Sequence, residues 1–389
     1  MKQKILICVN SLEFGGTERV VSILLNHLQA DFELHLALYY NIQSYSIPSE
    51  IKILQLRNKE TGTFKSFLFN AIEDSERLYR YCKENDIHTV VVFLHRFYFL
   101  SALMKMRKNF PGRIIMCHRT HTSKLIEHNP APIIYLKKRI MRWCLKRADL
   151  VLANSNAIKE DLERNYLKNK SVQVIVNPIE IEQIREKAKE PIRVEFRQEL
   201  FNVVVVARLR KEKDHLGILE ACRYLETAQI KVWFIGSGEL EQLLKEEARN
   251  KKVDQMVEFV GAASNPFPYI ANADLVLLNS YVEGLPNVIL EAMACKKAVV
   301  STDCESGPRE ILTESGEKTT FCEGYEITSC GILIPVNNPK VLASALIRIK
   351  VDNELRHSME EKAALRVKKF DISMLKPKFA NAFSDIRSI

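Results

Sequence analysis

Apolar runs of strand length alternate with stretches of helical periodicity along almost all of the 389-residue chain. The run Ile5–Val9 precedes a helical pattern through Val20–Leu25, and the runs at residues 89–94 and 273–278 are followed in the same way. This alternation predicts parallel α/β folding, because two parallel strands need a long crossover connection, usually a helix. The chain is longer than one hydrophobic core usually serves, so we expect two such domains.

The charged segment 180–199, which contains Pro191, separates the two alternating halves. Linkers between domains are often polar and carry proline, so we place a first domain over residues 1–190 and the second from residue 191. The last segment, residues 339–389, has the periodicity of successive amphipathic helices.

The composition is that of an ordinary globular protein, with 47% hydrophobic and 27% charged residues. The nine cysteines are scattered and form no Cys-x2-Cys pair, so we expect neither a zinc site nor a disulfide framework, and a reducing compartment. Residues 1–4 lead directly into a strand, and no uncharged apolar run is long enough to span a membrane. We therefore expect no signal peptide and a soluble or peripheral protein.

The net charge of +9 is concentrated in residues 104–147, where twelve lysines and arginines accompany a single acid, Glu127. Such a basic field suits an anionic membrane, a polyanion or nucleic acid, but no recognised nucleic-acid-binding module accompanies it. Two helical segments here, 97–108 and 132–147, combine aromatic and basic side chains. Each could be a core helix with a basic end; we favour membrane contact because both fall in the same charged region.

A strand–turn–helix unit at residues 273–294 carries the strongest functional signal. Its turn, Gly284–Asn287, ends in a residue that can cap the helix, and the amides of a first helical turn bind phosphate. Glu283 and Glu291 flank the turn with seven residues between them. Carboxylates repel phosphate, so these two are expected to accept hydrogen bonds from hydroxyl groups, and hydroxyls beside a diphosphate indicate a sugar nucleotide. For Glu-x7-Glu alone, two solvated glutamates are the alternative.

Two further loops of the first half contain candidate ligand contacts. Gly15 and Gly16 open the helix after the first strand, where backbone can approach a ligand closely, although a plain turn is an equal alternative. The strand 113–118 ends in His118-Arg119-Thr120-His121, at the carboxyl edge where parallel sheets bind ligands. A lone histidine is usually structural, but two at one strand end favour substrate contact, His118 first.

In the second half, Arg208 and Lys213 follow the buried strand 202–207. Cations at a strand end can clamp a phosphate leaving group, although charges in loops are often merely solvated. A later strand ends in Gly236-Ser237-Gly238, which lacks the longer dinucleotide fingerprint. We interpret it as a tight strand–helix turn near a nucleotide, without NAD binding.

These motifs together resemble the retaining GT-B glycosyltransferases of family 4. Glu283–Ala294 is similar to their Glu-x7-Glu segment, Arg208–Asp214 to their diphosphate-binding segment, and Gly15–Val20 to their amino-terminal glycine loop. In the second half the resemblance covers most of the domain; in the first it rests on the glycine loop and the strand order. It implies two facing Rossmann-like domains with an interdomain cleft: an acceptor-binding domain over 1–190, a nucleotide-sugar-binding domain over 191–368, and a terminal helix, 369–389, that packs back on the first domain.

The resemblance also implies roles for individual residues. His118, Lys213 and Glu283 are the expected catalytic residues, with Glu283 on the donor sugar and Glu291 on the ribose. The other acceptor-side residues are Glu18, Arg119 and His121. The donor-binding residues are Gly15, Gly16, Arg208, Lys213, Gly236, Gly284, Leu285, Pro286, Asn287 and Glu291.

We expect transfer from a UDP-sugar to a lipid-linked glycan in bacterial surface polysaccharide assembly, at the inner face of the cytoplasmic membrane. Ser306–Ile311 resembles the subset that often handles N-acetylhexosamines. No Asp-x-Asp motif occurs, so neither metal nor cofactor is expected. Alternatives are another donor such as UDP-glucose, UDP-galactose or GDP-mannose, a sugar-nucleotide 2-epimerase, and a non-catalytic membrane scaffold. The chain departs from the family at Lys296-Lys297 and in the long segment 313–330, which could alter substrate access.

Overall fold

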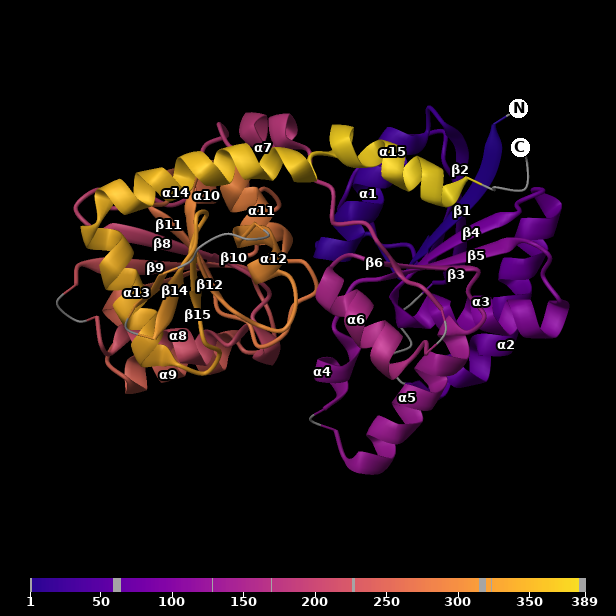
Figure 1. The fold of residues 1–389 in the computed structure, drawn as a ribbon, viewed down its shortest axis with the longest axis horizontal. Helices are drawn as coiled ribbons and strands as arrows, with labels where there is room; N and C mark the ends of the chain where they lie inside the picture. The colour runs from indigo at the N-terminus through magenta and orange to yellow at the C-terminus, as the bar shows by residue number, and fades with distance from the viewer. Residues whose placement is uncertain are drawn as a thin grey trace. The chain divides into compact units, whose positions relative to one another are not determined.

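Two compact units make up the chain in a computed structural model that describes residues 2–58, 64–127, 129–168, 170–225, 228–314, 320–322 and 324–384. The first unit consists of Met1–Pro178 and Ile372–Ile389, and the second of Ile179–Asp371. Each is a largely parallel sheet covered by helices, which confirms the predicted α/β class with two Rossmann-like units (Figure 1).

In the first unit, seven parallel strands lie in the order β3-β2-β1-β4-β5-β6-β7. Alternate residues of the inner strand β1 enter two cores: Leu6 and Cys8 pack with α2 and α3, and Ile5 and Ile7 pack with α1 and α15. The strands are β1 Gln3–Val9, β2 Phe32–Tyr40, β3 Lys52–Arg57, β4 Thr89–Phe93, β5 Arg113–His118, β6 Leu150–Ala153 and β7 Gln173–Val174. The helices are α1 Gly16–Leu28, α2 Phe64–Glu84, α3 Leu94–Lys108, α4 Thr122–Ile126, α5 Ala131–Leu145, α6 Asn156–Asn165 and α15 Ile372–Phe383.

In the second unit, the strand order is β10-β9-β8-β11-β12-β15-β14-β13, and β8, β9, β11 and β12 pack against α8, α9 and α13. The strands are β8 Phe201–Val206, β9 Ile230–Ile235, β10 Val257–Gly261, β11 Leu275–Leu278, β12 Ala298–Thr302, β13 Thr320–Cys322, β14 Tyr325–Ile327 and β15 Ile332–Ile334. The helices are α7 Ile181–Lys187, α8 His215–Cys222, α9 Glu241–Asn250, α10 Phe267–Asn272, α11 Asn287–Ala294, α12 Pro308–Leu312, α13 Pro339–Val351 and α14 Asn353–Arg366. Three short 3-10 turns cover Lys211–Lys213, Asp254–Met256 and Val367–Phe370.

The long segment 313–330 contributes two of these strands. β13 and β14 pair antiparallel with each other, and β14 pairs antiparallel with β15, so the segment extends the edge of the sheet. Residues 315–319 and 323 of the segment lie outside the described residues. An influence of the segment 313–330 on substrate access remains a prediction from the sequence.

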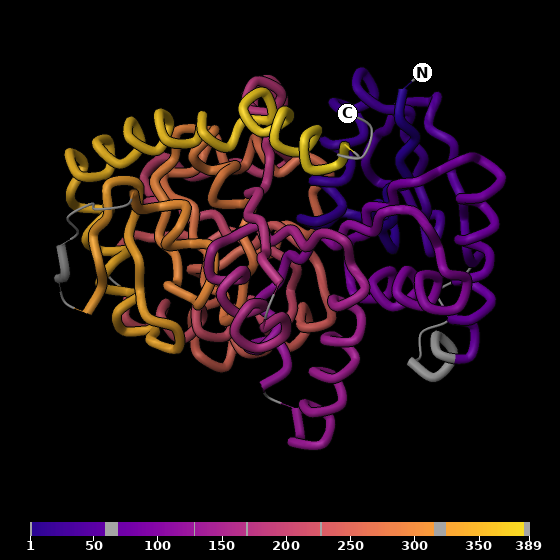
Figure 2. Tube along the Cα trace, turned by 45° about the vertical axis from the view of Figure 1, so that its right-hand side comes forward, coloured from indigo at the N-terminus to yellow at the C-terminus, as the bar shows by residue number. Residues whose placement is uncertain are grey.

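The division of the chain differs from the predicted boundary at residue 190. Helix α7 belongs to the second unit, because Arg185 Nε donates to the Ala294 carbonyl at the end of α11. Asp371 Oδ2 in turn accepts from the Ile181 amide, which ties the start of α7 to the last residue of the second unit. The chain then re-enters the first unit at Ile372, where α15 packs against α1 (Figures 1 and 2).

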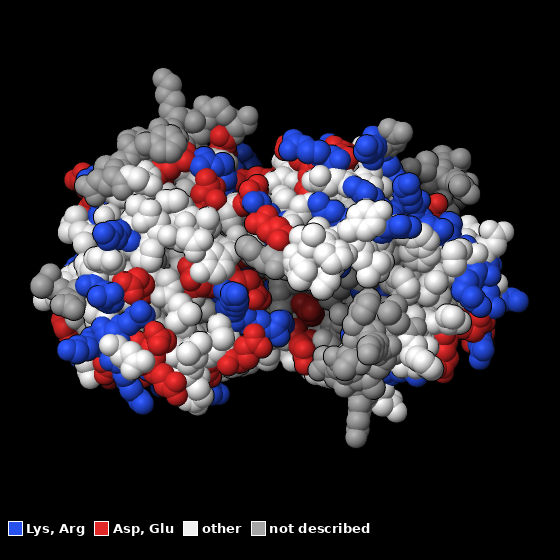
Figure 3. All heavy atoms as spheres, turned by 90° about the horizontal axis from the view of Figure 1, so that it is seen from below, with Lys and Arg blue, Asp and Glu red and all other residues white. Residues whose placement is uncertain are grey.

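The two segments expected at a membrane have different surroundings. In α3, Phe97, Tyr98 and Leu103 are buried against the sheet, so membrane contact by this helix is wrong and the core-helix alternative holds. In α5, which extends outward from the first unit in both views, Tyr135 and Leu136 are 62% and 55% exposed. Seen from below, basic and uncharged side chains are interspersed on the half of the molecule that contains the first unit (Figure 3).

Candidate functional site

The strongest site candidate in the second unit lies at the carboxyl ends of β8 and β11. These strands are parallel neighbours, so the loops that follow them emerge at one edge of the sheet. Lys213 ends the 3-10 turn after β8, and Glu283 lies in the turn after β11. Their Nζ and Oε1 atoms are 2.5 Å apart, with side chains 22% and 11% exposed. Two predicted site residues, 70 positions apart in sequence, are therefore brought together as a partly buried ion pair.

The turn after Glu283 leads directly into α11. Pro286 is the N-cap and Asn287 is the first helical residue, so the predicted capping role of Asn287 is wrong; no side-chain hydrogen bond caps this helix. Asn287 and Glu291 are both buried, at 9% and 5% exposure. The helix thus starts four residues after Glu283, and Glu291 follows one turn into the helix.

Hydrogen bonds from both neighbouring strands hold residues 279–283 in place. On the β8 side, the Tyr281 amide donates to the Glu212 carbonyl at 2.9 Å, and Asn279 Nδ2 donates to the Asp214 carbonyl at 3.0 Å. On the β12 side, Thr302 Oγ1 donates to the Ser280 carbonyl at 2.7 Å, and Ser306 Oγ donates to the Glu283 carbonyl at 2.6 Å. Sequence reasoning assigned none of these donors a role, although their place just after buried strands was a usable signal.

Arg208 and Gly236 occupy neighbouring strand ends. Arg208 lies just after the end of β8 and is exposed. Gly236 has a φ of +154°, and a Cβ there would overlap the Ala207 carbonyl oxygen. The glycine therefore allows close packing of the β9–α9 turn on the end of β8, which accounts for the tight turn that was predicted.

In the first unit, the glycine loop is at the carboxyl end of β1. Gly15 is the N-cap of α1 in an extended conformation, and Gly16 begins the helix. Tyr45 donates its hydroxyl to the Gly15 carbonyl at 3.4 Å and packs edge-on against Phe14. Glu18 lies in the first turn of α1 and is half-buried, so the loop places both backbone and a carboxylate at this edge of the sheet.

His118, the last residue of β5, points into the first unit. Its side chain is 1% exposed, its ring stacks on Tyr98 with 5.6 Å between centroids, and its Nε2 lies 2.5 Å from Thr122 Oγ1. Burial lowers the pKa of His118 to about 3, so the ring is neutral at physiological pH. The His118 ring can therefore form hydrogen bonds but carries no positive charge.

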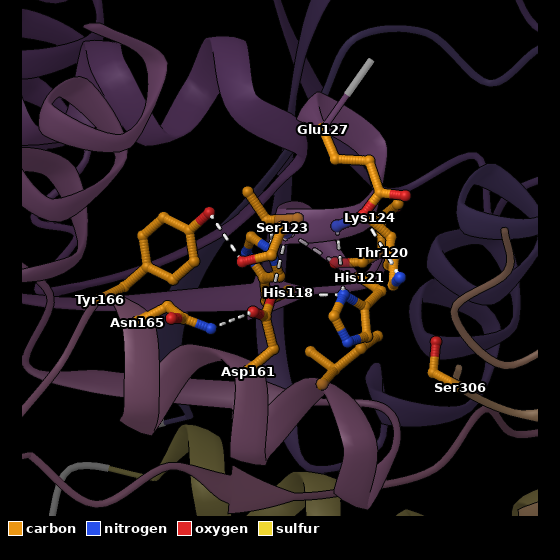
Figure 4. Close-up of polar contacts among 12 residues, drawn as sticks. His118, Thr120, His121, Ser123, Lys124, Glu127, Asp161, Asn165, Tyr166 and Ser306 are labelled. Carbon is orange, nitrogen blue, oxygen red and sulfur yellow. Dashed lines mark hydrogen bonds and ion pairs between the residues drawn. The ribbon is translucent and has the colours of Figure 1, made fainter. Parts of the chain in front are cut away.

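Arg119 and His121 lie nearer the rim of the same loop (Figure 4 shows His121). Arg119 is partly exposed, and its guanidinium donates to Asn177 Oδ1 at the end of the sheet. His121 is the N-cap of α4, and its side chain is 11% exposed. The three predicted acceptor-side residues at the end of β5 therefore divide into one fully buried ring, that of His118, and two more accessible groups.

Two kinds of feature are absent from the described residues. No group of three or more His, Cys, Asp or Glu side chains among them could hold a metal ion. No helix within the described ranges is both long enough and apolar enough to cross a membrane.

The protein families that match this chain, and a similar individual protein, are named as glycosyltransferases. The chain matches the family described as glycosyl transferases group 1 over residues 186–366, and the one described as glycosyltransferase family 4 over residues 14–183. It is 30% identical over 374 residues to the N-acetylgalactosamine-N,N'-diacetylbacillosaminyl-diphospho-undecaprenol 4-alpha-N-acetylgalactosaminyltransferase of Campylobacter jejuni, with 95% of this chain and 96% of that one covered.

Solved structures share the fold at lower identity. Alr3699/HepE of Anabaena in complex with UDP matches with a TM-score of 0.75 and 16% identity, over 98% of this chain and 99% of that one. Sucrose-phosphate synthase of Thermosynechococcus elongatus matches with a TM-score of 0.78 and 16% identity, over 98% of both chains.

Proposed function

The chain belongs to glycosyltransferase family 4, and on that premise we propose that it moves an N-acetylhexosamine from a UDP-sugar to a lipid-linked glycan, with retention at the transferred sugar. One observation carries the proposal: Lys213, Glu283 and the start of α11 lie together at one sheet edge. The donor and acceptor classes follow from the Campylobacter jejuni relative, which is named for N-acetylgalactosamine transfer and a diphospho-undecaprenol-linked substrate. Bacterial surface glycan assembly is the process that such chemistry serves.

On the donor side, the departure of UDP places negative charge on the β-phosphate. Arg208, Lys213 and the backbone around Gly284–Asn287 would stabilise that charge without a metal ion. Glu283 would then exchange its contact with Lys213 for a hydroxyl of the donor sugar, and Glu291 would hold the ribose. The ion pair keeps both side chains in position before the donor arrives.

On the acceptor side, the residues at the edge of the first sheet would meet the glycan. The Gly15–Gly16 backbone, Glu18, Arg119 and His121 supply both donors and acceptors for sugar hydroxyls and a linked phosphate. His118, neutral and buried, would contact the reacting sugar only through a hydrogen bond.

A lipid-linked acceptor also requires a membrane surface, and α5 fits that role. Ile133, Tyr135 and Leu136 are exposed apolar side chains on this helix, and Lys137 and Arg139 are exposed cations on the same helix. Apolar and basic groups side by side favour adsorption to anionic lipid.

The donor proposal is tested by incubating the protein with a panel of UDP- and GDP-sugars and measuring its melting temperature and product formation. We expect one UDP-N-acetylhexosamine to raise the melting temperature and to donate its sugar. Lys213→Ala should fold normally but lose at least about 100-fold in transfer, because the leaving phosphate loses its cation. Lys211→Ala, in the same turn but exposed, is the matched control and should retain activity.

Two outcomes would contradict the proposal. Unchanged turnover by Lys213→Ala would remove the phosphate-clamp role. Isomerised sugar nucleotide in the absence of any acceptor would instead identify a 2-epimerase, since epimerisation needs no second substrate.

A further inference from the structure

A buried carboxylate, Asp161, faces one of the two candidate histidines. Asp161 lies on α6, which follows β6, the neighbour of β5 in the sheet, and its side chain is only 1% exposed. Its Oδ2 is 3.6 Å from Nδ1 of His121, in the loop that follows β5 (Figure 4). No sequence motif marked Asp161, because the two residues come from different strand–helix units.

Asp161 accepts a hydrogen bond at each of its carboxylate oxygens. Oδ1 accepts from Asn165 Nδ2 at 2.9 Å, and Oδ2 accepts from the Ser123 amide at 3.2 Å. Burial of a carboxylate is costly unless hydrogen bonds compensate it, and here two donors do so. An N–H of His121 facing Oδ2 would add a third.

Nδ1 of His121 has two competing neighbours. Without a proton it can accept the Lys124 amide, 3.4 Å away; with a proton it can donate to Asp161. A neighbouring carboxylate favours the second arrangement, since a hydrogen bond to a charged acceptor is stronger than one between neutral groups. Nε2 has no partner within the described part of the chain, so in that tautomer it presents a lone pair.

His118 is arranged in the opposite way. Its Nε2 is already occupied by Thr122, and its ring lies between buried neighbours. Of the two histidines, only His121 has a carboxylate beside one of its nitrogens, whereas Nδ1 of His118 is enclosed in the core.

We propose that Asp161 is a positioning residue that fixes the Nδ1–H tautomer of His121, so that Nε2 accepts a hydrogen bond from a hydroxyl of the acceptor sugar. This inference rests on the proposed transferase function, which it deepens by naming the group that receives the acceptor. Asp161 touches no substrate itself and acts only through His121.

The kinetic test compares Asp161→Asn with Glu163→Gln, a matched loss of one carboxylate on the same helix. Glu163 accepts from the Val172 amide and has no contact with His121. Asp161→Asn should lower kcat/KM for the acceptor by at least about tenfold and leave the melting shift with UDP-sugar unchanged, whereas Glu163→Gln should retain activity. In a His121→Ala background, Asp161→Asn should cause no further loss.

Equal activities of the two single variants, or a full additional loss in the His121→Ala background, would overturn the inference. Nitrogen-15 spectra of the unmodified protein at pH 8 report the tautomer of His121 directly, so this test does not depend on whether an Asp161 variant folds. The His121→Gln variant identifies the His121 signal. The His121 signal should show a protonated Nδ1 and a bare Nε2, and the reverse tautomer would refute the proposal. Absence of transfer by the unmodified protein with every sugar nucleotide would instead refute the proposed function.

Discussion

At the scale of single residues, Gly307 packs closely against the turn that precedes α11. Its φ is +96°, and a Cβ there would lie 2.5 Å from the Gly284 carbonyl oxygen and 2.6 Å from Pro286 Cδ. Gly261 has a similar φ of +84°, but a Cβ there would meet nothing within 4 Å. The two glycines therefore share a backbone requirement, and only Gly307 also packs against the turn.

Gly307→Ala and Gly261→Ala together separate these two effects. Both should lose about 1–3 kcal/mol of unfolding free energy, since residues with a side chain rarely adopt positive φ. Gly307→Ala should lose about 1–3 kcal/mol more, because the new methyl displaces the turn, and should also weaken the melting shift caused by UDP-sugar. Urea denaturation and melting curves measure the two quantities; equal losses in the two variants would show that Gly307 does not support the turn.

Sequence reasoning found the chemical groups at this scale but not their contacts. Lys213 and Glu283 were each singled out by their place after a buried strand, yet their ion pair spans 70 positions and depends on the pairing of β8 with β11. Asp161 escaped notice for the same reason, and Ser306 was noted only as part of the segment Ser306–Ile311, without its contact to the turn. Their partners, the Glu283 carbonyl and the His121 ring, lie on other strand–helix units, and local patterns record only neighbours along the chain.

At the scale of elements, strand–helix alternation predicted the fold class because parallel strands leave few other connections. The sequence could not show which of α3 and α5 has a buried apolar face, because both helices combine aromatic and basic residues. The difference is what each apolar face meets: that of α3 covers the sheet, whereas Tyr135 and Leu136 of α5 face outward. Sequence patterns also do not show what the apolar side of α7 packs against. Its charged sequence resembled a linker, although Ile181 and Ile184 are buried in the second unit.

The outward face of α5 leads to a prediction about membrane binding. Leu136→Glu should weaken binding to vesicles of phosphatidylglycerol by about tenfold or more, because burial of one leucine contributes about 1.5–3 kcal/mol. Leu365→Glu on α14 is the matched control, since that leucine is 65% exposed but belongs to the other unit. Co-sedimentation at low and high salt measures binding; equal effects of the two substitutions would rule out α5 as the contact.

At the scale of the whole molecule, each unit contains a buried histidine that resists protonation. Burial lowers the pKa of His118 in the first unit to about 3. Burial, with the nearby charge of Lys213 as a smaller cause, lowers the pKa of His215 in the second unit to about 4. Both pKa values are below the ordinary histidine value of about 6.5, so acid should lower the stability of both units.

The sign of this sensitivity follows from proton binding. Below pH 6.5 the unfolded chain takes up protons at these histidines while the folded chain does not, so acid favours unfolding. Between pH 6.5 and pH 5, each histidine should remove about 2 kcal/mol of unfolding free energy. His215→Leu should therefore retain about 2 kcal/mol at pH 5 that the unmodified protein loses, as urea denaturation at pH 7 and pH 5 would measure. His88→Gln, at a ring whose side chain is 61% exposed, should leave the loss unchanged; if it reduced the loss as much as His215→Leu, burial would not be the cause.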